Sequence, residues 1–143
     1  MKRILDAHAL MVFFEKEPGY EKIAALFASA VESDDYLLIT AVNLGEVFYI
    51  ILRECGEKKA LEVEEIVQSL PIEIIEVDWQ LTREAAKLKA SNKMSYADCF
   101  AAALAIRRKG ELITGDPEFE AVENQIKIMW VKSKIRNDQR RSK

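Results

Sequence analysis

The sequence predicts a three-layer α/β sandwich: a mainly parallel sheet of about five strands with helices on both faces. Short apolar runs of strand length alternate with segments of helical periodicity along the whole chain. Parallel strands need long crossover connections, and the intervening segments are long enough to be helices. With 143 residues, half of them hydrophobic, the chain is most simply one domain around a single core.

In the first half of the chain, breaker residues separate the expected elements. Pro18-Gly19 stops the first helix, Gly56 suits a helix C-cap, and Pro71 stops the last helix of this half. The expected elements, in order, are a strand at 2–5, helices at 7–17 and 20–33, a strand at 36–40, and helices at 43–55 and 57–70.

In the second half, IEIIEV at 72–77 is the clearest strand pattern because it is rich in β-branched residues. Asp78 suits the N-cap of the helix after it, and Ser95 opens an alanine-rich helix that ends at Gly110. The expected elements here are a strand at 72–77, helices at 79–92 and 96–109, a strand at 111–114, a short acidic helical turn, and a strand at 126–131.

Charge is unevenly distributed along the chain. Residues 132–143 hold six basic residues and one acid, a net charge of +5, whereas residues 1–131 hold 15 basic and 23 acidic residues, a net charge of −8. We expect one domain over 1–131 followed by a basic C-terminal tail over 132–143. The tail favours contact with a polyanion, and a solvated, frayed terminus is the equally open alternative.

No apolar stretch is long enough to cross a bilayer, and no secretion signal opens the chain. Cys55 and Cys99 have no metal-binding spacing, so reduced thiols are expected. These features predict a cytoplasmic protein with no membrane association.

Four acids are expected at the carboxyl edge of the sheet. Asp6 and Asp116 follow strands, Glu46 lies early in the helix entered from strand 36–40, and Asp98 lies in the first turn of the alanine-rich helix. The carboxyl ends of parallel strands and the N-termini of following helices meet at that edge. Each acid also has a local explanation, since Asp6, Asp98 and Asp116 suit helix caps or first turns. Four acids at one edge of the sheet together favour a catalytic or metal-binding site over four unrelated structural roles.

Clustered carboxylates repel one another unless a cation or a proton neutralises them. Their hard oxygen ligands suit Mg²⁺ or Mn²⁺, while zinc is disfavoured because His8 is the single histidine. Two strand-ending threonines, Thr40 and Thr114, are candidates to hydrogen-bond a carboxylate or phosphate. His8, two residues after Asp6, is close enough to the edge to touch a phosphate or a bound water. The structural alternatives are backbone capping for Thr40 and simple packing or solvation for His8.

With Asp6 after the first strand, VNLGEV around Glu46, YADCFAAALA around Asp98 and TGDPEF around Asp116, the chain resembles the PIN domain family, and within it the VapC-type ribonuclease toxins. The resemblance implies a five-stranded parallel sheet and Mg²⁺- or Mn²⁺-dependent hydrolysis of RNA phosphodiester bonds, with these four acids as the catalytic and metal-binding set. It implies Glu118 as an auxiliary acid. It also implies a homodimer and a small antitoxin protein as partner.

Other functions fit less well. A phosphoacceptor receiver domain needs an acid pair after the first strand, whereas Asp34-Asp35 precedes a strand. Dinucleotide binding is excluded by the absence of GxGxxG after the first strand. A non-catalytic PIN-like module that binds nucleic acid or protein remains the alternative. Trp79 and Trp130 are expected in the core or in a dimer contact.

Overall fold

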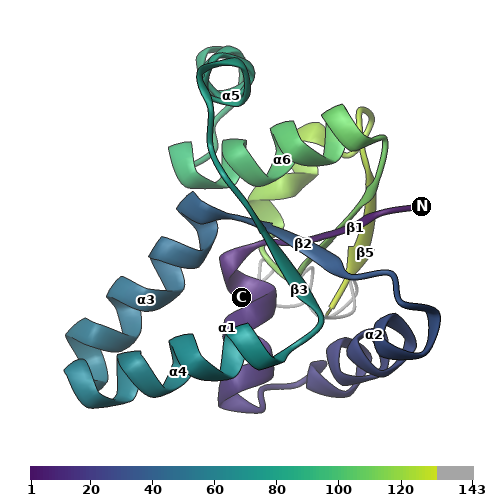
Figure 1. Ribbon diagram of the computed structural model, residues 1–143. Coiled ribbons are helices and arrows are strands. Elements are labelled where there is room, and N and C mark those ends of the chain that lie inside the picture. The colour runs from purple at the N-terminus through teal and green to yellow at the C-terminus, as the bar shows by residue number, and fades with distance from the viewer. Residues whose placement is uncertain (132–143) are drawn as a thin grey trace, which may run out of the picture.

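The computed structural model describes residues 1–131 (Figure 1). The predicted basic tail at 132–143 lies outside the described residues. Among residues 1–131, no helix is both long and apolar enough to cross a membrane.

A five-stranded sheet with every neighbouring pair parallel forms the centre of the fold, as predicted. Its strand order is β3-β2-β1-β4-β5. The register pairs Leu5 with Ile113, and Thr40 with Ile75, so the carboxyl ends of the strands align at one edge. The strands are β1 (Arg3–Leu5), β2 (Leu37–Thr40), β3 (Ile72–Ile75), β4 (Glu111–Thr114) and β5 (Lys127–Trp130).

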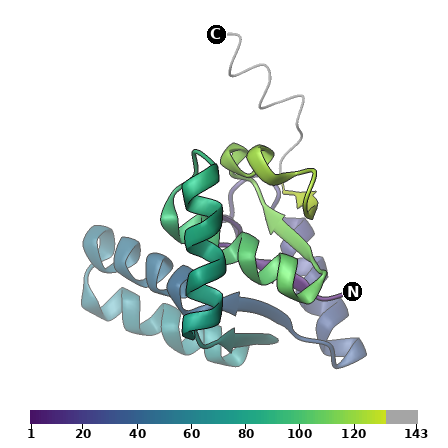
Figure 2. The ribbon, with the colours of Figure 1, turned by 90° about the horizontal axis from the view of Figure 1, so that it is seen from above.

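Helices cover both faces of the sheet, and the alternation of side chains along each strand divides the core between them (Figures 1 and 2). Leu5 and Ile113 face a cluster built with the first four helices, whereas Ile4 and Leu112 face a cluster built with the others. The first group is α1 (Ala7–Glu15), α2 (Tyr20–Ser33), α3 (Ala41–Cys55) and α4 (Glu57–Ser69); the second is α5 (Trp79–Ser91), α6 (Tyr96–Arg108) and the 3₁₀ helix η1 (Pro117–Val122).

Side-chain caps begin several helices at the predicted residues. Asp78 accepts a hydrogen bond from the backbone N–H of Leu81, 2.8 Å away, and begins α5. Thr40 caps α3 by accepting from the N–H of Asn43, 3.0 Å away. The helix therefore begins two residues earlier than the predicted start at residue 43, since the strand's last residue is itself the cap.

Two expectations from the sequence need correction. The strand at 72–77 is shorter than predicted, because β3 ends at Ile75 and the chain then turns toward α5. Trp79 is 69% exposed, which rules out the core position expected for it, while the alternative expectation, a dimer contact, stays a prediction. Trp130, in contrast, is partly buried and packs against the cluster that contains α5 and α6.

Candidate functional site

The end of β1 places Asp6 at the centre of the carboxyl edge, fully buried. One carboxylate oxygen accepts from the N–H of Ala9, 2.7 Å away, and so caps α1. The other accepts a hydrogen bond from the hydroxyl of Thr114 at the end of β4. That hydroxyl oxygen also accepts from the N–H of Asp116, 2.9 Å away. Thr114 therefore links the first acid to the last.

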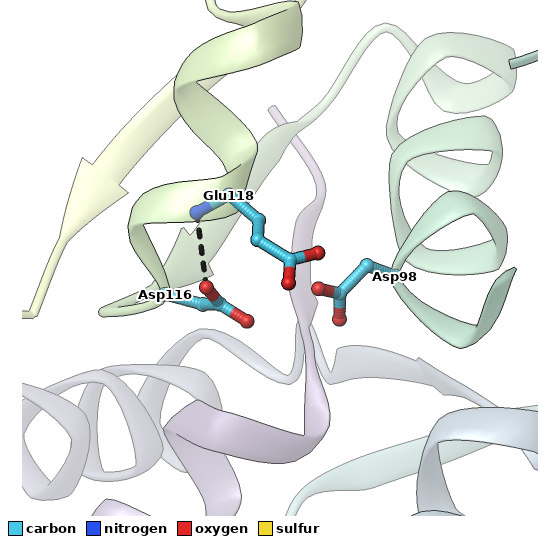
Figure 3. Close-up of side chains that lie close together, drawn as sticks. All are labelled: Asp98, Asp116 and Glu118. Atoms are coloured by element: carbon cyan, nitrogen blue, oxygen red, sulfur yellow. Dashed lines mark hydrogen bonds between the residues drawn. The ribbon is translucent and has the colours of Figure 1, made fainter. Parts of the chain in front are cut away.

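Asp98, Asp116 and Glu118 converge from α6 and η1 (Figure 3). One carboxylate oxygen from each lies within 4.8 Å of the other two. Asp116 is the N-cap of η1, accepting from the N–H of Glu118 at 3.0 Å. Glu118 reaches back to α6, where it accepts from the N–H of Ser95 at 2.8 Å. This bond ties η1 to the start of α6 and holds the three acids together.

Glu46 approaches the same edge from α3 and is held there by Asn43. The buried amide of Asn43 donates to Glu46 at 3.3 Å and to the backbone carbonyl of Ala97 at 3.0 Å. Its own oxygen accepts from the hydroxyl of Thr40 at 2.6 Å. One side chain thus connects the end of β2, the fourth acid and the residue before Asp98.

His8 packs against the turn that bears Asp116. A Cβ atom added to Gly115 would lie 2.6 Å from Cε1 and 3.0 Å from Nδ1 of the His8 ring. A glycine is therefore required between Thr114 and Asp116, because any larger residue would displace the ring or the turn. The structure gives His8 a packing role beside the acids; a direct chemical role stays a prediction.

Burial and mutual repulsion make these acids hard to ionise. Burial, supplemented by the charges of Asp116 and Glu46, raises the pKa of Asp6 to about 7 against the opposing hydrogen bonds from Thr114 and Ala9. Burial also raises the pKa of Asp98 to about 9, with Asp116 the largest neighbouring contribution.

The pKa of Glu46 is raised by burial as well, with smaller contributions from Asp116 and Glu118 and a hydrogen bond from Asn43 in opposition. Near neutral pH the cluster must therefore hold protons or bind a cation.

A divalent cation of the magnesium class fits this set of donors. The tight group of Asp98, Asp116 and Glu118 offers only carboxylate oxygens, the hard ligands that Mg²⁺ and Mn²⁺ take. Opposite ligands of a bound Mg²⁺ lie about 4 Å apart, close to the observed spread. A cation there would also relieve the repulsion that raises these pKa values.

The structure brings all four sequence-predicted acids to one edge and adds detail that the sequence did not supply. Glu118, expected only as an auxiliary residue, belongs to the tightest group, while Glu46 lies outside it. Thr114 holds Asp6 as a candidate carboxylate partner, and Thr40 caps a helix while positioning Asn43. The link from Glu118 to the backbone of Ser95 had no signal in the sequence.

Known proteins share the fold described above. The PIN domain family model matches residues 3–125 of the chain. No curated protein matches it. Among solved structures, the DNA-bound VapBC from Salmonella typhimurium is 21% identical, covers 92% of this chain and 99% of its own, and superposes with a TM-score of 0.75.

Two further structures have the same fold. VapBC2 from Rickettsia felis, bound to a DNA fragment from its promoter, is 20% identical, with 90% of this chain and 98% of its own covered and a TM-score of 0.71. VapC20 from Mycobacterium tuberculosis, described as a sarcin–ricin loop cleaving toxin, is 16% identical, with 85% of this chain and 95% of its own covered and a TM-score of 0.65. At these identities the likeness establishes the fold.

Proposed function

This chain belongs to the PIN domain family, and from that premise we propose that it is a divalent-metal-dependent endoribonuclease that hydrolyses RNA phosphodiester bonds. The observation that supports this most is the carboxylate cluster at the carboxyl edge, in which burial and repulsion raise the pKa values of Asp6, Glu46 and Asp98. Buried carboxylates that served only a structural role would destabilise the fold with no compensating interaction. A cation-binding site explains why these carboxylates are clustered.

In this proposal Asp98, Asp116 and Glu118 hold a Mg²⁺ or Mn²⁺ ion, and Asp6 and Glu46 complete the acidic set. When bound, such an ion supplies positive charge that stabilises the developing negative charge on the phosphate. Asp6, clamped through both oxygens, keeps one orientation. Of the two acids outside the metal-holding group, Asp6 is buried, whereas Glu46 is partly exposed and held by Asn43, so Glu46 is the one of the two that can exchange a proton with solvent.

Similarity to the VapBC structures supports a toxin–antitoxin setting. We propose that the chain is the toxin of a type II pair, acts in the cytoplasm as a homodimer, and is inhibited by a small antitoxin protein. The sarcin–ricin loop cleavage ascribed to VapC20 supports RNA as the substrate class. The role assignments for Asp6, Glu46, Asp98 and Asp116 are part of the same proposal.

The test compares RNA cleavage by the intact chain with that by Asp98→Asn and Asp116→Asn, each with Mg²⁺ or Mn²⁺ and with EDTA. Losing a ligand should reduce kcat about 100-fold or more, because charge stabilisation of the phosphate is lost. Asp78→Asn is the matched control, since Asp78 is an N-cap aspartate that contacts Leu81 and Arg107.

Equal cleavage by all variants would overturn the assignment of roles. RNA binding without cleavage by the intact, metal-supplied chain would instead support the non-catalytic module.

A further inference from the structure

Two adjoining hollows lie beside the second half of α6. The larger, of about 470 Å³, is formed where α5 crosses the outer side of α6 (Figures 1 and 2). The smaller, of about 220 Å³, lies between the end of α6 and the start of β5. Ile106 and Gln125 line both, so the two hollows adjoin and are called the basic groove below. The larger hollow is within the size range of pockets that hold a small-molecule ligand.

The basic groove differs in charge from the molecule around it. Among the described residues that line it, four are basic and one, Glu84, is acidic, a net charge of +3. Residues 1–131 as a whole carry a net charge of −8. The basic residues, all exposed, are Lys87 of α5, Arg107 and Lys109 at the end of α6, and Lys127 at the start of β5. The groove therefore attracts a polyanion that the rest of the described chain repels.

Helix electrostatics explain only part of this gathering of cations. Arg107 and Lys109 lie at the C-terminus of α6, where the helix dipole favours positive charge. Lys87 and Lys127 belong to α5 and β5, so the dipole of α6 does not account for them. Three elements far apart in the sequence thus supply cations to the same groove.

The acids beside these cations hold them only weakly. Arg107 lies 3.6 Å from Asp78, and Lys87 lies 3.7 Å from Glu84. Ion pairs of this length between exposed or partly exposed side chains contribute little to stability. Both cations can therefore turn toward a phosphate group without a large loss of stability.

The helix α6 joins the basic groove to the carboxylate cluster. Asp98 lies in the first turn of α6, and Arg107 lies nine residues later, about 14 Å along the helix axis. Successive phosphates of one strand of a duplex are about 3.4 Å apart along its axis, so this separation corresponds to about four nucleotides. An RNA that is cut beside Asp98 can therefore also reach Arg107.

We propose that the basic groove is a second RNA-binding site, which holds backbone phosphates of a folded RNA while another part of that RNA lies at the carboxylate cluster. This inference rests on the proposed ribonuclease function. The lysine and arginine side chains bind phosphates without reading bases, so the groove adds affinity that is independent of sequence. It adds this affinity only for RNA that extends about four nucleotides or more beyond the cut bond.

The first part of the experiment compares two charge-matched pairs of substitutions in the full chain. Arg107→Gln with Lys109→Gln removes two cations from the groove, and Lys58→Gln with Lys59→Gln removes two exposed cations from the start of α4. Each pair also breaks one exposed ion pair. The helix α4 packs on the opposite face of the sheet from α6, so the second pair leaves the groove intact.

The second part removes an acid instead of a cation. Glu84→Gln removes the acid that lines the groove, and Glu62→Gln on α4 is its matched control. Each of these acids lies three positions from the lysine with which it pairs, Lys87 and Lys59 respectively. Loss of the acid should strengthen RNA binding in the groove, which a general loss of stability would not do.

Each variant is tested for cleavage of two RNAs with Mg²⁺: a folded RNA, and an oligonucleotide of about four nucleotides with the same cut bond, too short to reach the groove. Cleavage kinetics give KM and kcat. Fluorescence anisotropy of the labelled folded RNA gives affinity over a series of salt concentrations. Each binding measurement is made with Asp116→Asn added, so that RNA is bound without being cut.

Arg107→Gln with Lys109→Gln should raise KM for the folded RNA about tenfold and leave kcat within about twofold. It should reduce the slope of log affinity against log salt by about 1.4–1.8 and leave KM for the short RNA unchanged. Glu84→Gln should lower KM for the folded RNA about twofold. Both α4 controls should match the intact chain, and all melting temperatures should agree, because only exposed ion pairs are lost.

An unchanged KM and salt slope for the folded RNA in the Arg107→Gln, Lys109→Gln variant would overturn the proposal. Equal effects of the two cation pairs would overturn it too, since net charge would then be the cause. An equal rise in KM for the short RNA, or weaker binding by Glu84→Gln, would also contradict it. Failure of the ribonuclease function is distinct, because the intact chain would then cleave neither RNA while the anisotropy series still decides whether the groove binds RNA.

Discussion

Replacing Asp6 by asparagine should stabilise the metal-free protein near pH 8. Asp6 is fully buried, and burial together with Asp116 and Glu46 raises its pKa from 3.8 to about 7. Ionised, this carboxylate is a buried charge whose two hydrogen bonds offset the cost of its burial only in part. Asparagine keeps an oxygen that can accept from the N–H of Ala9, so the cap of α1 survives while the charge disappears.

The magnitude follows from the pKa difference. The unfolded chain loses the Asp6 proton near pH 3.8 and the folded chain near pH 7. Between these values the folded state binds more protons, so the free energy of unfolding falls as pH rises through that window. A shift of this size corresponds to about 4 kcal/mol above pH 7, and disruption of the Thr114 hydrogen bond offsets about 1–3 kcal/mol.

The net stabilisation by Asp6→Asn is about 1–3 kcal/mol, a rise in Tm of about 3–9 °C for a domain of this size. It should shrink as pH is lowered from 7 toward 4, where wild-type Asp6 is protonated in the folded state. Thermal melts in EDTA across this pH range measure the effect.

Asp78→Asn is the matched control, because Asp78 also caps a helix but its pKa is lowered by the backbone hydrogen bond from Leu81 and by Arg107. That variant should not gain stability. A Tm for Asp6→Asn below that of wild type at pH 8, or a gain that persists at pH 4, would refute the reasoning. Added Mg²⁺ should raise the Tm of wild type more than that of Asp6→Asn.

Three further outcomes are expected. Gly115→Ala should lower Tm and the rate of cleavage, because the added Cβ would lie 2.6 Å from the His8 ring. Adding His8→Ala should restore Tm. The explanation by packing fails if the double variant melts no higher than Gly115→Ala alone. Asn43→Ala should destabilise the fold by about 1–3 kcal/mol in urea unfolding. It should also slow RNA cleavage, since Glu46 loses its hydrogen-bond donor. An unchanged cleavage rate would show that Glu46 needs no such positioning. Gly45→Ala should stabilise α3 by up to about 1 kcal/mol in the same unfolding assay, because its Cβ would meet no atom within 4 Å; a loss of stability would reveal strain.

The order and type of the elements were predictable from the sequence because they depend on local chemistry. Pro18-Gly19 ends a helix wherever it occurs, Asp78 and Ser95 cap the helices that follow them, and β-branched runs favour strands. The ends of the elements were predicted less accurately, since β3 stops at Ile75. The exposure of Trp79 depends on how α5 packs, and the local sequence pattern holds no information about that packing.

The gathering of Asp6, Glu46, Asp98 and Asp116 at one edge also followed from the sequence, because parallel strands all end on the same side of their sheet. The sequence did not indicate which of these side chains contact one another or a shared neighbour. The strand order that sets β4 beside β1 brings Thr114 to Asp6, and the packing of η1 against α6 brings Glu118 to Ser95. These contacts join residues up to 108 positions apart. They were decided by the tertiary structure, because only the packing of the whole core sets the distance and orientation between side chains so remote in the chain.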